Sequence, residues 1–79
     1  MFIKIEISST LQSLVAVSGK NLSGDQWEVS EGSPAGAVLD LLGLNQVPTM
    51  LIINKTAATE NTFLKEGDTL KIFPLVSGG

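Results

Sequence analysis

The sequence predicts an α+β fold in which one main helix lies across a mixed sheet of four to five strands. Two stretches, residues 2–7 and 69–73, alternate apolar and polar side chains with the period of two that is typical of half-buried strands. Between them, residues 34–42 carry a helical apolar pattern, and residues 50–53 are apolar throughout. No repeat or linker divides these elements, so we expect a single folded domain.

The first strand is predicted at residues 2–7, where three isoleucines share one face while Lys4 and Glu6 share the other. Residues 11–17 fit two structures. The apolar residues at 11, 14 and 15 have helical spacing, whereas residues 14–17 also fit a short buried strand. A short helical turn or an irregular segment packed on the core is the preferred interpretation.

A second short strand is predicted at residues 26–30, after a loop at residues 18–25 that is rich in Ser, Gly and Asn. Trp27 and Val29 are expected on one face of this strand. Trp27 is interpreted as an anchor in the core or at its rim rather than as a platform for a ligand.

The clearest helix is predicted at residues 34–42. Ser33 is the expected N-cap, and Pro34 suits the first helical position, where its missing N–H has no intrahelical partner. Gly43 is the expected left-handed stop. Three residues form the apolar stripe that is expected to face the sheet: Val38, Leu41 and Leu42.

Residues 50–53 fit a strand that is covered on both faces or central in the sheet. Asn54-Lys55 opens a turn, and residues 56–62 form a loop with room for a short edge strand. Phe63-Leu64 is expected to return to the core.

The last strand is predicted at residues 69–73, with Leu70 and Ile72 on its buried face. A tight turn at residues 65–68 precedes it, and Gly67 can supply the positive φ that such a turn needs.

The composition excludes most kinds of autonomous enzyme. The 79 residues include no Cys, no His and no Arg, so the chain has no zinc site of the usual kind and no Ser-His-Asp or Cys-His nucleophile. The carboxylates are scattered over loops and turns, where a solvated surface is the expected role. Gly19-Lys20 lacks the surrounding residues of a phosphate-binding loop. We therefore expect no metal and no bound cofactor.

The charge and the hydropathy pattern bear on partners and location. A formal net charge of −3 argues against nucleic acid and fits a basic protein partner. No targeting signal is evident, and no stretch approaches the roughly 18 apolar residues of a membrane helix. The absence of Cys favours a reducing compartment, so the cytoplasm is the expected location.

One reactive group remains, the α-carboxylate of Gly79, which follows Gly78. Because glycine has no Cβ, a Gly-Gly tail can thread a narrow channel in a partner enzyme and leaves the terminal carbonyl open to attack. A frayed end without a function is the alternative. Composition alone does not decide between the two interpretations.

The C-terminal stretch from Leu64 to Gly79 resembles the C-terminal signature of the ubiquitin-like sulfur carriers (the MoaD/ThiS family). In that family a leucine and a Gly-Asp turn, here Gly67-Asp68, lead into a last strand that runs to a terminal Gly-Gly. The apolar strand ending in Asn54 matches another family feature, with Lys55 in place of the family's glycine.

The family includes the small subunit of molybdopterin synthase and the carrier of the thiamine pathway. Phe73-Pro74 is nearer the molybdopterin branch, which commonly shows two prolines where this chain has Pro74-Leu75. The resemblance implies a β-grasp (ubiquitin-like) domain at residues 1–74 and a flexible tail at residues 75–79.

The resemblance also implies a function, in which the protein is a carrier and not itself an enzyme. An activating enzyme would use ATP to adenylate Gly79, a sulfur donor would form a thiocarboxylate there, and a synthase or large subunit would accept the sulfur. Gly78 would keep the tail slim, and Phe73 would either dock the partner or cover the second face of the sheet. Three further residues are expected to contact partners at the channel mouth or beside it: Ser77, Val76 and Leu75.

Several alternatives remain open. The molybdopterin or tungsten cofactor pathway is favoured, and thiamine is possible. A ubiquitin-like protein modifier and a β-grasp interaction module with an idle tail are the other functions considered. Phe2 and Phe63 are weaker docking candidates, and packing in the core or at an edge is their expected role.

Overall fold

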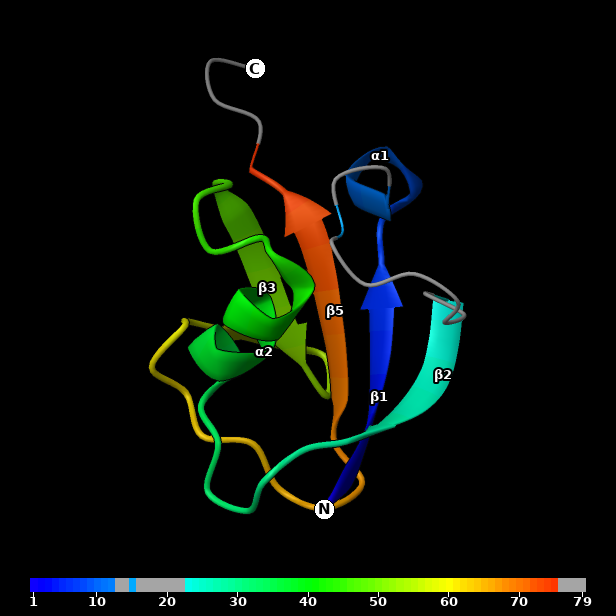
Figure 1. Ribbon diagram of the computed structural model, residues 1–79, viewed down its shortest axis with the longest axis vertical. Helices are drawn as coiled ribbons and strands as arrows, with labels where there is room; N and C mark the ends of the chain where they lie inside the picture. Colours follow the sequence, from blue (N-terminus) through cyan, green and yellow to red (C-terminus); the bar gives the residue numbers. More distant parts are fainter. Residues whose placement is uncertain (13–14, 16–22, 76–79) are drawn as a thin grey trace.

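Five strands form one mixed sheet in the computed structural model, which describes residues 1–12, 15 and 23–75 (Figure 1). The order across the sheet is β2-β1-β5-β3-β4. The two central strands run parallel, and every other neighbouring pair is antiparallel. The strands are β1 (Phe2–Ile7), β2 (Ser23–Glu28), β3 (Thr49–Ile53), β4 (Thr56–Ala58) and β5 (Thr69–Pro74).

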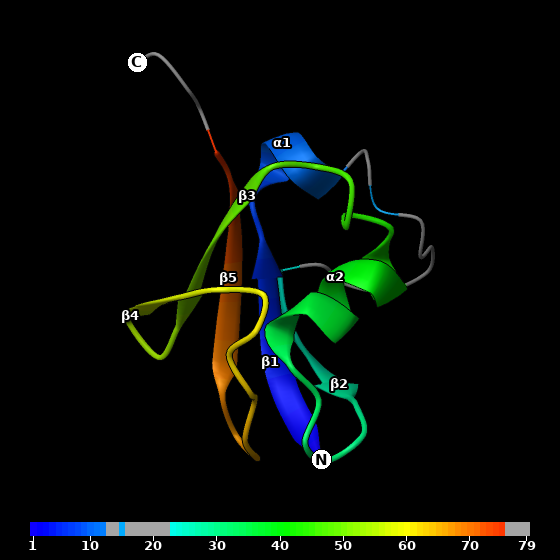
Figure 2. The same ribbon diagram turned by 90° about the vertical axis from the view of Figure 1, so that its left-hand side faces the viewer.

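One helix, α2 (Ala35–Leu42), crosses a single face of this sheet (Figure 2). The short α1 (Ser9–Gln12) lies at the end of the sheet where β1 finishes. Within the described ranges no helix covers the opposite face, which we call the open face. The predicted α+β fold, with a hairpin, a crossover helix and returning strands, is confirmed, and the strand order is that of a β-grasp sheet.

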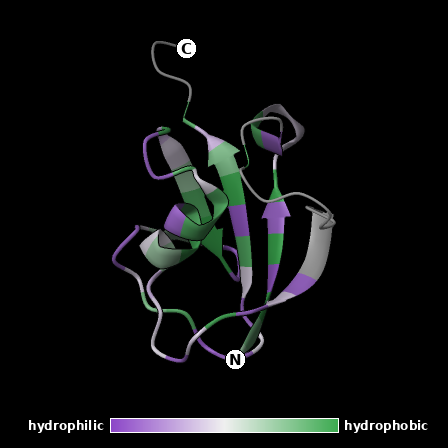
Figure 3. Ribbon diagram, in the orientation of Figure 1, coloured by the Kyte–Doolittle hydropathy of each residue, from purple (hydrophilic) through white to green (hydrophobic). Residues whose placement is uncertain are grey.

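The core lies between α2 and the sheet, and the alternation in the strands places it there. Residues of β1 and β5 alternate hydrophobic and hydrophilic along each strand (Figure 3). Ile5 lies beside Leu70 and Ile7 beside Ile72 in the parallel register, and all four side chains are buried. The predicted buried faces of both strands are therefore confirmed.

The second strand differs from its prediction in its bounds. β2 begins at Ser23 rather than at residue 26, because Ser23 and Asp25 pair with Glu6 and Ile5 of β1. The end of the predicted loop at residues 18–25 is thus strand, while residues 16–22 lie outside the described residues. The prediction that Trp27 is a core anchor is confirmed, since its side chain is buried.

The segment predicted as a helical turn at residues 11–17 overlaps α1, which runs from Ser9 to Gln12 and buries Leu11. The end of that segment, apart from Val15, lies outside the described residues.

The start of the main helix was predicted one residue too early. Pro34 is the N-cap, with an extended backbone, and Ser33 Oγ donates to Ser30 O at 2.6 Å instead of capping the helix. Instead, backbone carbonyls of a loop from later in the chain accept hydrogen bonds from the first N–H groups of the helix. Ala35 N donates to Thr62 O and Gly36 N to Glu60 O, both at 2.8 Å. Backbone carbonyls from a distant segment thus replace a side-chain cap.

The buried stripe of α2 also differs from the prediction in one residue. Leu41 is 51% exposed, so its predicted place against the sheet is wrong. Leu39 is buried in its place. The helix buries one arc with spacing i, i+3, i+4, i+7: Ala35, Val38, Leu39 and Leu42. The left-handed stop at Gly43 is confirmed by its φ of 77°.

Strand β3 is inside the sheet, between β5 and β4, as one of the two alternatives predicted. Burial on both faces is wrong, because Met50 is 46% exposed and only Leu51 and Ile53 are buried. The residues of β3 are all apolar after Thr49 because one face packs on the core, while apolar side chains on its other face remain uncovered on the open face. The predicted short edge strand is confirmed as β4.

Only one residue of the pair Phe63-Leu64 returns to the core. Leu64 is buried, but Phe63 is 67% exposed, so its predicted core or edge packing is wrong. Its backbone forms an isolated bridge with Pro34. Phe2 is exposed as well, at the start of β1.

Candidate functional site

The candidate site begins where β5 ends and the tail starts. Thr49 of β3 pairs with Pro74, and Leu75 N donates to Pro48 O at 3.1 Å, one step beyond the strand. This bond ties the root of the tail to β3. Four of the predicted site residues lie outside the described residues, so their assignment stays a prediction: Gly79, Gly78, Ser77 and Val76.

The two predicted docking residues that the structure describes lie on different sides of the sheet. Phe73 alternates with the buried Ile72, so it lies on the open face and is half-buried there. Leu75 is 57% exposed and borders a hollow of about 430 Å³ together with Pro48 and Thr49. The structure therefore places exposed apolar surface on both sides of the tail root.

An apolar patch surrounds Phe73 on the open face. Met50 lies directly opposite Phe73 in the antiparallel pair of β3 and β5, and side chains in such pairs are about 5 Å apart. Ile52, two residues along β3, lies on the same face and is half-buried. We call Met50, Ile52 and Phe73 the open-face patch.

Sequence reasoning proposes Phe73 but misses its two companions in this patch. Met50 and Ile52 are apolar residues of an all-apolar run, which by itself predicts a strand buried on both faces. The signal that could have found them is the order of elements, since a single helix covers only one face of a sheet. Phe73 does contribute to covering the second face, and it also leaves apolar surface available to a partner.

A polar cluster fixes the strands that support this patch. Asn54 Nδ2 donates to Asp68 Oδ1 at 2.7 Å, and Thr69 N donates to Asn54 Oδ1 at 3.0 Å. Lys65 N donates to Asp68 Oδ2 at 2.8 Å. We call this the Asn54–Asp68 clamp, and it fastens the β3–β4 hairpin to the start of β5.

The clamp corrects the expected role of one carboxylate. Asp68 was expected on a solvated surface, but it is only 8% exposed, because its hydrogen-bond donors and the turn enclose it. The predicted tight turn is confirmed, with Gly67 at a φ of 83°. Two features that carried the family resemblance, Asn54 and Gly67-Asp68, thus form one structural unit.

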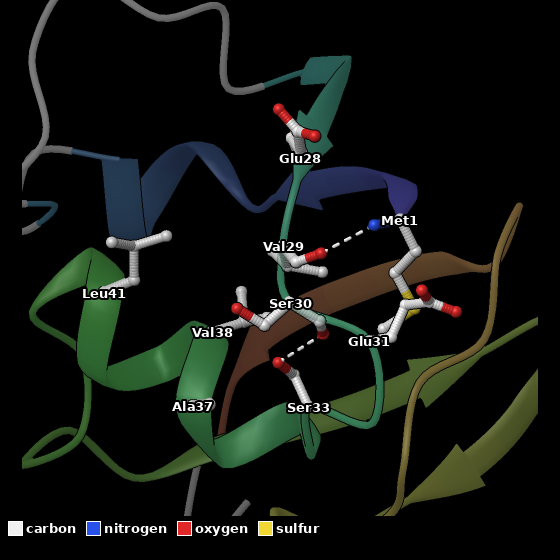
Figure 4. Close-up of a pocket in the computed structure, with 9 residues that line it drawn as sticks. All are labelled: Met1, Glu28, Val29, Ser30, Glu31, Ser33, Ala37, Val38 and Leu41. Atoms are coloured by element: carbon white, nitrogen blue, oxygen red, sulfur yellow. Dashed lines mark hydrogen bonds between the residues drawn. The ribbon is translucent and has the colours of Figure 1, made fainter.

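A separate hollow of about 520 Å³ lies between α2 and the segment that precedes it (Figure 4). Figure 4 shows Met1 N donating to Val29 O at 2.8 Å, with Glu31 near Met1 and Leu41 at the other side. Met1 precedes β1 and Leu75 follows β5, so in these parallel strands the hollow and the tail root lie at opposite ends of the sheet. The hollow is therefore not part of the site at the tail.

The described residues offer no chemistry of their own at either place. Within residues 1–12, 15 and 23–75, no group of three or more His, Cys, Asp or Glu gathers where it could hold a metal. The part of the chain that the structure describes also contains no helix that is long and apolar enough to cross a membrane. The arrangement can present a surface and a tail to another protein.

Comparison with known proteins identifies similar sequences and folds. The model of the ThiS family matches residues 8–79. The crystal structure of SAMP1 from Haloferax volcanii is 21% identical, covers 100% of both chains and superimposes with a TM-score of 0.70. A putative molybdopterin converting factor, subunit 1, from Pyrococcus furiosus is 15% identical, with 96% of this chain and 99% of that chain covered and a TM-score of 0.72.

No curated protein matches the chain. At these identities the two solved structures establish a shared fold, and they confirm the predicted ubiquitin-like β-grasp architecture.

Proposed function

The chain belongs to the ThiS family, and from this membership we propose that it is a sulfur carrier whose working group is the α-carboxylate of Gly79. The observation that carries the proposal is the extent of the family match, which runs through Gly78 to Gly79. The small carriers of this family are not catalysts themselves. In the same way this chain would be a co-substrate for partner enzymes.

The proposed chemistry proceeds through an activated carboxylate. An oxygen of the Gly79 carboxylate attacks the α-phosphorus of ATP on the activating enzyme, and pyrophosphate leaves. The resulting acyl-adenylate is a good electrophile because AMP is a good leaving group. Sulfide then attacks the carbonyl carbon and expels AMP, which leaves a thiocarboxylate on Gly79. Transfer of the sulfur to an acceptor in a synthase, with water supplying an oxygen, regenerates the carboxylate.

The folded domain would provide the surface on which a partner docks while it processes this tail. The open-face patch gives a partner an apolar surface beside the tail root, which the bond from Leu75 N to Pro48 O holds in place. In the partner's channel, Gly78 would keep the tail slim while Ser77 and Val76 lie at the channel mouth. Leu75 would contact the partner from the other side of the sheet.

The pathway we propose is synthesis of molybdopterin or of the tungsten cofactor. Phe73-Pro74 supports this choice, as does the fold shared with a putative molybdopterin converting factor. Thiamine synthesis is the alternative, in line with the description of the matching family. Because adenylation consumes ATP, we place the protein in the cytoplasm.

A protein modifier is the second candidate function. The fold shared with SAMP1, and with the structure described as small archaeal modifier protein 1, favours it. The same acyl-adenylate would then be attacked by a lysine amine of another protein, and an isopeptide bond would form. Covalent conjugates in cells that disappear when Gly79 is removed would identify this function. A pure interaction module would keep its function when residues are appended to Gly79.

Isotope exchange between pyrophosphate and ATP tests the proposed adenylation. We expect exchange when the full chain is mixed with the ATP-dependent activating enzyme of the same organism. Exchange should be lost when Gly79 is deleted, because no carboxylate then reaches the nucleotide. A Ser30→Ala variant, altered far from the tail, is the matched control and should exchange normally. Equal exchange with and without Gly79 would exclude the proposal.

A further inference from the structure

A hydrogen bond at the root of the tail extends the ladder of β3 and β5 by one residue. Leu75 N donates to Pro48 O at 3.1 Å, directly after the pair of Thr49 and Pro74. Figure 1 shows the end of β5 beside the start of β3, where this bond forms. Four residues follow Leu75 in the chain, and the last of them, Gly79, bears the carboxylate.

Two prolines leave the N–H of Leu75 as the donor that ends this ladder. Directly opposite residues of an antiparallel pair often exchange two hydrogen bonds. Proline has no backbone N–H, so Pro48 cannot return a bond to Leu75 O, and Pro74 cannot donate to β3. The attachment of the tail root to β3 therefore depends on the one bond from Leu75 N to Pro48 O.

The acceptor of this bond is held in place by the core. Pro48 ends the connection between α2 and β3, and Leu44 in that connection is fully buried. Leu44 N donates to Leu39 O at 2.8 Å, and Val47 N donates to Leu44 O at 3.0 Å. Val47, directly before Pro48, packs against the core. A carbonyl fixed in this way gives the tail root one position relative to the folded domain.

The position of the root limits how far the Gly79 carboxylate can reach. A fully extended chain spans at most about 3.3–3.6 Å per residue, so the four residues after Leu75 span at most about 14 Å. The carboxylate must come within about 3.5 Å of the atom that it attacks. Each residue released from the ladder would lengthen the reach by about 3.5 Å and widen the range of directions in which the carboxylate can point.

We propose that Leu75 N–H and Pro48 O form a positioning pair, which sets the direction and the free length of the tail. This inference rests on the proposed function, in which the Gly79 carboxylate attacks ATP. The pair restricts the chain to partners whose reacting atom lies no deeper than four residues can reach. It also removes conformations in which the carboxylate points away from that atom. Because orientation of the reacting groups governs the chemical step, the pair acts on kcat rather than on docking of the domain.

An exchange of one amide for an ester tests the pair on the full chain, made by chemical synthesis. Replacing Leu75 with its α-hydroxy acid removes the N–H and keeps the side chain. With the activating enzyme of the same organism, kcat for pyrophosphate exchange should fall about tenfold while KM for the carrier stays within about twofold. Leu75→Ala keeps the N–H and removes the apolar side chain, so it should raise KM and leave kcat within about twofold. Equal kcat values for the ester chain and the wild type would overturn the proposal.

The length of the tail gives a second test with its own control. Deleting Val76 shortens the reach by about 3.5 Å, so kcat should fall at least about a hundredfold. Val76→Gly removes the same side chain at full length, and its kcat should stay within about twofold of the wild type. A deletion variant with the kcat of the wild type would show that the root gives way, which contradicts the proposed limit on reach.

Nuclear magnetic resonance of the free chain separates this inference from the proposed function. A scalar coupling across the hydrogen bond should join Leu75 N to the carbonyl carbon of Pro48. The Leu75 amide should exchange with solvent at least about tenfold more slowly than a random-coil amide of the same sequence. A missing coupling, or exchange at the random-coil rate, contradicts the pair even if the chain is adenylated. If the wild-type chain is never adenylated, the proposed function fails, while these two measurements still decide whether the root is held.

Discussion

At the scale of single residues, Lys55 occupies a backbone region that lysine rarely adopts. Its φ is 70°, and the φ of Asn54 is 51°, so both central residues of the β3–β4 hairpin are left-handed. Two-residue hairpins with this geometry favour Asn-Gly. The geometry thus explains why the family has glycine here. Lysine in place of that glycine leaves a strained position in this chain.

We therefore expect Lys55→Gly to stabilise the protein. Relief of the left-handed strain, about 1–2 kcal/mol, should exceed the entropic cost of glycine, which leaves a net gain of about 0.5–1 kcal/mol. Urea unfolding should show a higher midpoint with an unchanged slope. Lys55→Ala is the control, because it removes the side chain but keeps Cβ, and it should give no gain. A gain shared by both variants would show that charge, not φ, destabilises the turn.

The Asn54–Asp68 clamp makes a second residue-level prediction. Asp68→Ala leaves the Asn54 amide and Lys65 N without their acceptors in a place that is only 8% exposed. We expect a loss of about 2–3 kcal/mol, because unsatisfied buried groups keep their full desolvation cost. Glu66→Ala is the comparison. It removes one exposed bond, from Phe2 N, and should cost at most about 0.5 kcal/mol. Similar losses for both variants would contradict a structural role for the clamp.

The clamp also shows what a sequence cannot reveal at this scale. Asn54 and Asp68 are both recognisable as family features, but their contact depends on the pairing of β3 with β5. Without that register, Asp68 resembles any carboxylate in a turn.

At the scale of elements, α2 depends on a loop from later in the chain. Gly36 lies against this loop, and a Cβ built there would be 3.0 Å from the backbone oxygen of Glu60. That oxygen already accepts from Gly36 N at 2.8 Å, so it cannot retreat without losing the bond that satisfies the helix start. Tertiary packing here outweighs helix propensity.

Gly36→Ala should therefore destabilise the protein even though alanine is the better helix former. Propensity alone predicts a gain of about 1 kcal/mol, whereas we expect a net loss of about 1 kcal/mol from the contact with Glu60. The midpoint of urea unfolding measures the difference. Ala37→Gly, at an exposed position of the same helix, should lose about 1 kcal/mol by propensity alone. A stabilised Gly36→Ala variant would show that the loop gives way easily.

The elements differ in how well the sequence predicted them, for one physical reason. Strands β1 and β5 were predicted closely, because their alternation directly reports one buried face. The cap of α2, the exposure of Leu41 and the open strip of β3 depend on which segment lies next to them. That information is held by residues far away in the chain, such as Glu60 and Thr62.

At the scale of the whole molecule, we expect the stability of the folded domain not to depend on the tail. The core of the described residues runs from Ile3 to Ile72, before the tail root. We expect a chain truncated after Leu75 to keep its Tm within about 2 °C of the full chain, since terminal residues contribute little to stability. Calorimetry of the two chains measures this. A clearly lower Tm would show that the tail packs on the domain and would contradict the predicted division into a folded domain and a separate tail.

The surface of the whole molecule also limits what sequence could foresee. The Gly78-Gly79 tail was predicted as the working end from the family resemblance, because composition alone did not decide between a functional tail and a frayed end. The charge of each face of the sheet was not evident from a net charge of −3, because the sum hides where each Lys and Glu lies.

The central claim is that Gly79 carries sulfur as a thiocarboxylate, and intact-protein mass spectrometry tests it most directly. The full chain is incubated with its activating enzyme, ATP and a sulfide source, alongside a chain that lacks Gly79. We predict that the full chain gains the mass of one oxygen replaced by sulfur, that fragmentation places the change on Gly79, and that the truncated chain is unchanged. A mass gain in the truncated chain, or one that maps to any other residue, would contradict the claim.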